Sequence, residues 1–141
     1  MFTCSVWTLT CTSWMTTKIS SKADLKSVGA TLHDARFASE DIDFDAKAGT
    51  FCLKCWVLDP KPKLGGVGPR WRANQLSFSN VANCTVETRE VVSYYELATI
   101  RFARRNGRLE LVTHYGIEIS LQIREPNGAL IETDETEENW S

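Results

Sequence analysis

The clearest pattern of hydrophobic and polar positions lies between residues 94 and 124, YYELATIRFARRNGRLELVTHYGIEISLQIR. Apolar and polar side chains alternate there with the period of half-buried β-strands. Asn106-Gly107 is typical of a two-residue type I′ hairpin turn, because both residues tolerate a positive φ. On that turn three cross-strand pairs are predicted: Arg105–Arg108, Phe102–Leu111 and Ile100–Thr113.

The second turn of this segment follows from the faces of its strands. A two-residue turn at 115–116 would place apolar side chains on opposite faces. A three-residue loop, His114-Tyr115-Gly116 with Gly116 left-handed, instead places Leu111 opposite Ile119 and Leu109 opposite Leu121. We therefore predict a three-stranded antiparallel meander whose apolar stripe faces the core.

The rest of the chain predicts further short strands, at 41–45, 50–58, 70–81 and 82–88. Residues 50–58 are apolar on both faces, which indicates a strand that is covered on each side or lies against the N-terminal segment. Residues 25–37 are ambiguous, because their apolar spacing fits a helix while Gly29 and the later Phe37 favour extended structure. We predict a strand bent near Gly29, with a short helix as the alternative.

These elements predict an all-β fold, or a β-rich fold with at most one short helix. We expect an antiparallel sandwich or partly closed barrel of about seven or eight strands that ends in the meander. The 141 residues divide into a disordered extension at 1–23, one β domain at 24–125 and an acidic tail at 126–141. Met15 is an alternative start.

Charge, apolar runs and cysteine spacing limit the classes of partner and location that we expect for this chain. The net charge of −2 counts against nucleic acid and anionic membranes as general partners. No run approaches the ~18 apolar residues of a membrane helix. The five cysteines do not have the spacing of a secreted disulfide framework, so we expect reduced thiols and a cytoplasmic location.

Several segments together resemble a known family. They are L-H-D-A at 32–35, the strand pair 41–56, Arg70-Trp71-Arg72 with Leu76, Phe78 and Val81, the run 97–102, the glycine-led strands 107–111 and 116–121, and Leu130, Asp134 and Trp140. In order and spacing they resemble a family of small uncharacterised bacterial proteins, widespread in Proteobacteria, with a domain of unknown function. The chain departs from that family at His33, where glutamine is usual, and at the loop 59–69. The resemblance implies one domain and no assigned activity.

Two groups of residues raise the question of catalysis or metal binding. Cys52 and Cys55 form a C-x-x-C, but residues three apart on a strand point to opposite faces, so core packing is favoured over a redox or metal site. His33-Asp34 and His114 are candidate acid–base groups, yet on a strand His33 and Asp34 would diverge. Asp41, Asp43 and Asp45 alternate as on a solvent-facing strand, with a cation site as the alternative.

Basic residues gather at two places. With Trp71 they form the candidate interaction surface: Lys61, Lys63, Arg70, Trp71, Arg72, Arg101, Arg104, Arg105 and Arg108. We predict a non-catalytic cytoplasmic binding or interaction module, with a protein as a possible partner and no cofactor. One alternative is a single-stranded nucleic-acid binder that uses the basic residues near 61–72 and 101–108. The other is a small enzyme or a redox or metal site at Cys52 and Cys55.

Overall fold

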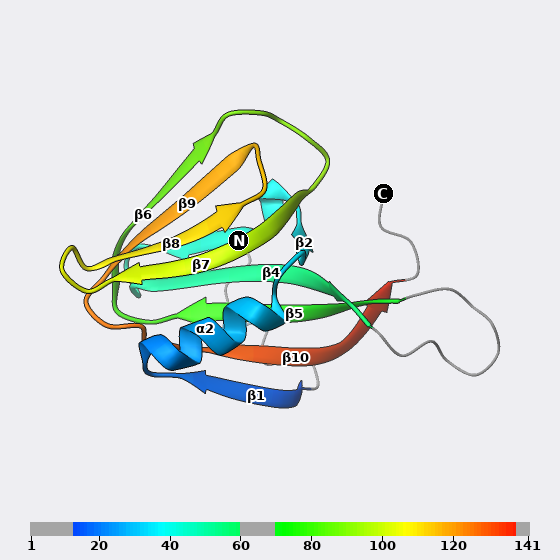
Figure 1. Cartoon of the computed structure of the whole chain (residues 1–141), viewed down its shortest axis with the longest axis horizontal. Helices are drawn as coiled ribbons and strands as arrows, with labels where there is room; N and C mark the ends of the chain where they lie inside the picture. The colour runs from blue at the N-terminus through cyan, green and yellow to red at the C-terminus, as the bar shows by residue number, and fades with distance from the viewer. Residues whose placement is uncertain (1–12, 60–69, 138–141) are drawn as a thin grey trace.

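The computed structural model describes residues 13–59 and 70–137, which form ten strands, one α-helix and one 3-10 turn (Figure 1). The elements are β1 (Ser13–Ile19), α2 (Lys22–Thr31), β2 (Arg36–Phe37), η1 (Ser39–Asp41), β3 (Ile42–Asp45), β4 (Thr50–Leu58), β5 (Trp71–Phe78), β6 (Val81–Thr88), β7 (Tyr95–Ala103), β8 (Arg108–Thr113), β9 (Ile117–Ile123) and β10 (Gly128–Glu137). The helix is too short to cross a membrane.

The strands form one antiparallel sheet in the order β1-β10-β5-β4-β2-β7-β8-β9-β6, with β3 paired to β4. The short strand β2 joins its two halves, because Arg36 pairs with Trp56 of β4 and with Glu96 of β7. The sheet is not closed into a barrel. This confirms the predicted all-β antiparallel class with a single short helix, although the described residues form more strands than we expected.

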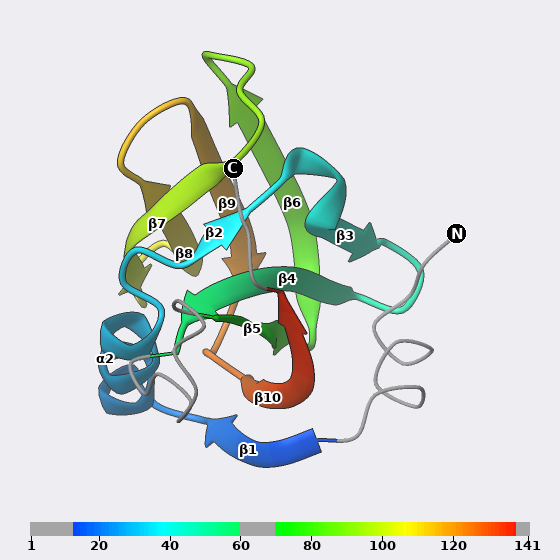
Figure 2. The same ribbon diagram turned by 90° about the vertical axis from the view of Figure 1, so that its right-hand side faces the viewer.

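The core lies between the two halves of the sheet. Figure 2 shows the half that contains β4, β5, β10 and β1 facing the half that contains β6 to β9. Phe51 and Leu76 of the first half and Leu109 and Ile119 of the second belong to one buried cluster. Cys52 and Trp56, on the opposite face of β4 from Phe51, are also buried, so the prediction that this strand is covered on both sides is confirmed.

The meander is present as β7, β8 and β9. Its second turn is confirmed, because Leu111 pairs with Ile119, Leu109 pairs with Leu121, and Gly116 has φ +93°. The first turn was predicted wrongly. The pairs are Ala103–Arg108, Phe102–Leu109 and Ile100–Leu111, and only Gly107 of the Asn106-Gly107 pair has a positive φ.

Helix α2 occupies most of the segment for which we preferred a strand, so the helical alternative is the correct one there. Its N-cap, Ser21, accepts a hydrogen bond from the Asp24 amide at 3.1 Å, and the Asp24 carboxylate accepts from the Ser20 amide at 2.9 Å. The first bond satisfies an amide group that a helix leaves unpaired at its start, and the second ties the residue before the N-cap to the first turn. The helix buries Leu25 and Val28 and lies between β1 and β7 (Figure 1).

Gly29 lies inside this helix and supplies a stability test. A Cβ at Gly29 would lie 3.8 Å from the Ile100 amide nitrogen, an ordinary contact. Because glycine inside a helix costs about 0.5–1 kcal/mol relative to alanine, we expect Gly29→Ala to raise the free energy of unfolding by that amount. Urea denaturation followed by circular dichroism measures it, and a loss of stability would contradict the helical assignment.

Both ends of the described chain contribute strands: residues 13–19 of the predicted extension form β1, and residues 128–137 of the predicted acidic tail form β10. β1 pairs with β10, and β10 also pairs with β5. Acidic residues of β10 meet cations of the neighbouring strands: Glu135 lies 3.0 Å from Lys54, and Glu132 lies 3.9 Å from Arg72. Residues 1–12 and Trp140 lie outside the described residues.

Candidate functional site

The predicted basic surface does not form one patch in the part of the chain that is described. Lys61 and Lys63 lie outside the described residues. Arg70, Trp71 and Arg72 lie at the start of β5, whereas Arg101 to Arg108 surround the β7–β8 turn. Figure 1 places the start of β5 and this turn at opposite ends of the molecule.

The residues at the start of β5 make contacts within the fold. The Arg36 guanidinium lies over the Trp71 ring at 4.4 Å and over the Tyr94 ring at 4.5 Å, so the two rings enclose a cation of this chain. Arg72 donates to the Thr133 carbonyl at 2.9 Å and lies 3.5 Å from the Asp59 carboxylate. These side chains hold β5, β10 and the segment after β4 together.

The arginines around the β7–β8 turn are exposed. Arg101 and Arg108 each lie 3.7 Å from the Glu110 carboxylate, and Arg104 and Arg105 are at the tip of the turn. Exposed ion pairs of this kind add little stability. A charged hairpin tip is typical of an edge that avoids pairing with other chains.

Cys52 and Cys55 do not form a pair with each other. Cys52 is disulfide-bonded, which departs from our expectation of reduced thiols, and Cys55 is a free thiol in the core. Burial raises the pKa of Cys55 to about 12, which keeps it protonated and unreactive at neutral pH. The structure therefore agrees with the prediction that the two sulfurs diverge across the strand.

Two of the three aspartates of the 41–45 segment accept hydrogen bonds from backbone amides close to them in the sequence. Asp41 belongs to η1 and accepts from the Ala38 amide at 2.9 Å, while Asp45 accepts from the amides of Lys47 and Ala48 in the β3–β4 turn. Burial raises the pKa of Asp41 and of Asp43. The three carboxylates do not converge on one point in the manner of a cation site.

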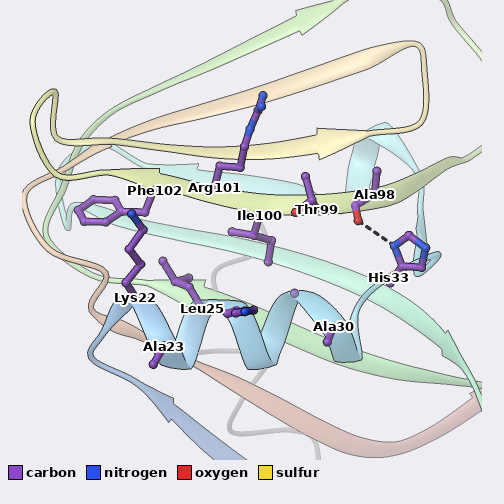
Figure 3. Close-up of a pocket in the computed structure, with 12 residues that line it drawn as sticks. Lys22, Ala23, Leu25, Ala30, His33, Ala98, Thr99, Ile100, Arg101 and Phe102 are labelled. Atoms are coloured by element: carbon purple, nitrogen blue, oxygen red, sulfur yellow. Dashed lines mark hydrogen bonds between the residues drawn. The ribbon is translucent and has the colours of Figure 1, made fainter.

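A groove of about 750 Å³ lies between α2 and β7. Figure 3 shows that Leu25 and Ile100 point toward each other across it, and that Lys22 extends toward Phe102 at one end. His33 lies at the other end (Figure 3). The residues that line the groove are Lys22, Ala23, Leu25, Lys26, Gly29, Ala30, His33, Ala98, Thr99, Ile100, Arg101 and Phe102.

At the His33 end, the structure brings together the three acid–base candidates that we expected to lie apart. His114 Nε2 lies 2.7 Å and His33 Nε2 lies 3.6 Å from the same oxygen, Asp34 Oδ1. The two imidazole rings meet edge to face with centroids 5.7 Å apart. We define these three residues as the His–Asp–His cluster. All three side chains are exposed.

Strand β7 positions every member of this cluster through consecutive backbone carbonyls. The His114 amide donates to the Glu96 carbonyl at 3.0 Å, and the Asp34 amide donates to the Leu97 carbonyl at 2.8 Å. His33 Nδ1 donates to the Ala98 carbonyl at 2.8 Å (Figure 3). The chain reverses at Asp34, which has φ +68°, a conformation that aspartate tolerates better than most residues.

The electrostatics of the cluster keep its carboxylate ionised. The hydrogen bond from His114 is the main cause that lowers the pKa of Asp34 below its usual range, and the nearby imidazoles of His33 and His114 add to this. Desolvation opposes the shift. Asp34 is therefore available near neutral pH as an anionic acceptor or metal ligand.

Sequence reasoning missed this cluster because it placed His33 and Asp34 on a strand, where neighbours point to opposite faces. A readable signal existed in Ser21-x-x-Asp24, an N-cap pattern that predicts a helix start and hence a turn after Thr31. No such local signal connects Asp34 with His114, which lies 80 residues away.

Comparison with known proteins gave no match to a protein-family model, a curated protein or a solved structure. The resemblance to a bacterial family therefore stays a prediction.

Proposed function

We propose that the protein is a non-catalytic binding module that holds a small amphipathic anion in the groove between α2 and β7. The observation that carries the proposal is the groove itself, whose volume of about 750 Å³ lies within the range of small-molecule sites. Its apolar floor lies beside two lysines of one helix face. Of the residues that we predicted as an interaction surface and that the structure describes, only Arg101 lines the groove.

The floor of the groove suits an apolar body. Leu25, Ile100 and Phe102 contribute buried side chains, and Gly29 and Ala30 leave room above the helix. Because these side chains are already buried, the apolar surface that binding removes from water is mainly that of the ligand, which stabilises the complex by roughly 25 cal/mol per Å² before the costs of association.

The rim of the groove suits a negatively charged group. Lys22 and Lys26 are exposed, lie one helical turn apart, and make no ion pair or hydrogen bond within the described residues. Arg101 turns instead toward β8, where Glu110 lies 3.7 Å away (Figure 3). The two lysines are therefore the cations available to a ligand, and they favour a carboxylate or sulfonate head group.

Titration with 1-anilinonaphthalene-8-sulfonate, an apolar sulfonate that fluoresces when it leaves water, tests this proposal. We expect saturable binding with one site per chain. The double variant Lys22→Glu, Lys26→Glu should weaken that binding by about tenfold or more, because it reverses both charges beside the head group.

The matched control is Lys18→Glu, Lys47→Glu, which makes the same charge change at exposed positions on β1 and in the β3–β4 turn. It should leave the affinity within about twofold, because neither lysine lines the groove and exposed charges are screened by salt. Ala30→Trp, which fills the groove, should abolish binding. Equal losses in both double variants, or full binding by Ala30→Trp, would refute the groove as the site.

A location in the cytoplasm is part of this proposal, although the disulfide at Cys52 counts against it because cytosolic thiols are kept reduced.

The nucleic-acid alternative predicts a different dependence of binding on salt. Binding of a random single-stranded oligonucleotide that falls steeply with salt would favour it over an amphipathic anion, because phosphate contacts release counterions.

A further inference from the structure

The geometry points to a second binding site, one for a divalent transition-metal ion, at the His–Asp–His cluster. His33 Nε2, Asp34 Oδ1 and His114 Nε2 supply three ligand atoms. The site adjoins the groove at His33 but is a separate proposal, because neither lysine that would bind the anion belongs to it.

The spacing of the ligand atoms suits one ion. Nitrogen and oxygen ligands bind Zn²⁺ at about 2.0–2.2 Å, so two ligands of a tetrahedral ion lie roughly 3.3 Å apart. The two imidazole nitrogens lie 2.7 and 3.6 Å from Asp34 Oδ1, which brackets that separation, and all three atoms lie within 4.8 Å of one another. Small rotations of the exposed rings are enough to close the site.

The hydrogen bond of His33 prepares its ring for a metal ion. A backbone carbonyl only accepts, so the bond to the Ala98 carbonyl places the proton of His33 on Nδ1. Nε2 then carries the lone pair and points toward Asp34. Metal-bound histidines are generally held in this way, with the second ring nitrogen donating to a carbonyl or carboxylate.

Asp34 and His114 supply the other two ligand atoms. The proton between them is displaced when the ion binds. His114 Nε2 donates to Asp34 Oδ1 in the metal-free protein. When the ion binds between these atoms, that proton moves to His114 Nδ1 or to solvent, and both lone pairs face the metal. The backbone anchors on β7 stay in place during this exchange, so it needs no rearrangement of the main chain.

The ligand set decides the class of ion. Two imidazoles with one carboxylate favour Zn²⁺, Ni²⁺ or Cu²⁺ over Mg²⁺ and Ca²⁺, which prefer oxygen ligands only. The exposed side chains leave the remaining coordination positions to water. Within the described residues this is the one group of three ligand side chains that converge, and it uses both histidines of the chain.

Because the chain has two histidines, imidazole ¹⁵N spectra of the full-length protein report directly on the site. We expect one equivalent of Zn²⁺ to shift the Nε2 signals of both rings while both Nδ1 atoms carry protons. Mg²⁺ at the same concentration should shift neither. Zn²⁺ bound only by cysteine thiols would leave both rings unchanged, and that result would overturn the proposal.

Variants separate coordination from a structural role. Asp34→Asn keeps the side-chain size and tolerates the left-handed backbone, so we expect a folded protein with Zn²⁺ affinity lowered by on the order of 10–100-fold in calorimetry. Asp134→Asn, at an exposed aspartate of β10, is the matched control and should not change it. His33→Ala and His114→Ala should each lower the affinity as Asp34→Asn does. Unchanged affinity in these variants would refute the site.

Discussion

Replacing Gly128 with alanine is expected to lower the free energy of unfolding by about 3 kcal/mol. Gly128 opens β10 and pairs with Phe78 of β5. A Cβ at this position would lie 2.0 Å from the Ser77 carbonyl oxygen and 2.9 Å from the Phe78 ring. Because the nearest obstacle is backbone, the two strands must separate at this end to admit a single methyl group.

The direction of the change in stability distinguishes this position from an ordinary glycine. Glycine-to-alanine changes usually stabilise a protein by about 0.4–1 kcal/mol where the backbone permits, through the unfolded chain. Gly29→Ala in α2 is the matched control and should raise the midpoint of a urea denaturation curve, whereas Gly128→Ala should lower it. If Gly128→Ala is neutral, β10 does not dock on β5 as described, and residues 126–141 behave as the solvated tail that their charge suggests.

The strand faces of the meander could be predicted more securely than its register. The first hairpin slipped by two residues relative to prediction, because a four-residue connection replaces the two-residue turn at Asn106-Gly107. A slip of two keeps every side chain on its face, since strand side chains alternate. The core stripe was therefore right, including Leu109 and Leu111, even where the partners assigned across the ladder were wrong.

The sequence did not favour the helix or predict the terminal strands, for different reasons. In α2, Gly29 lowers the helix propensity, and Ser21 and Asp24 carry the one clear sign of its start. In β10, the acidic composition indicates a solvated segment. It is held by backbone pairing with β1 and β5 and by burial of Leu130, and Lys54 and Arg72 of other strands lie beside its acidic residues. Such pairings connect distant segments, and local patterns do not reveal them.

The candidate site shows the same dependence on distant contacts. The basic residues at the two ends of the predicted surface were identified from composition, but their separation depends on the topology of the sheet. The His–Asp–His cluster forms because β7 anchors the turn after α2 and the β8–β9 loop on three adjacent carbonyls. An error in one element, the predicted strand at 25–37, was enough to conceal it.

The second large effect is expected at Leu111, where alanine should lower the free energy of unfolding by about 3–4 kcal/mol. Leu111 is fully buried in the middle strand of the meander and pairs with Ile100 on one side and Ile119 on the other. Truncation there leaves a cavity lined by strands that are held in place on both sides. The surroundings therefore cannot collapse to fill it, which places the cost in the upper part of the usual range for such changes.

Leu58→Ala is the matched control, because it removes the same atoms from the end of β4, where the side chain is 44% exposed. It should cost less than about 1 kcal/mol in the same denaturation experiment. The groove gives a second readout, since Ile100 lines it and pairs with Leu111. A cavity behind Ile100 should weaken anion binding in Leu111→Ala at temperatures where the variant is still folded. The same loss of affinity in Leu58→Ala would show that the effect is not transmitted through this pair.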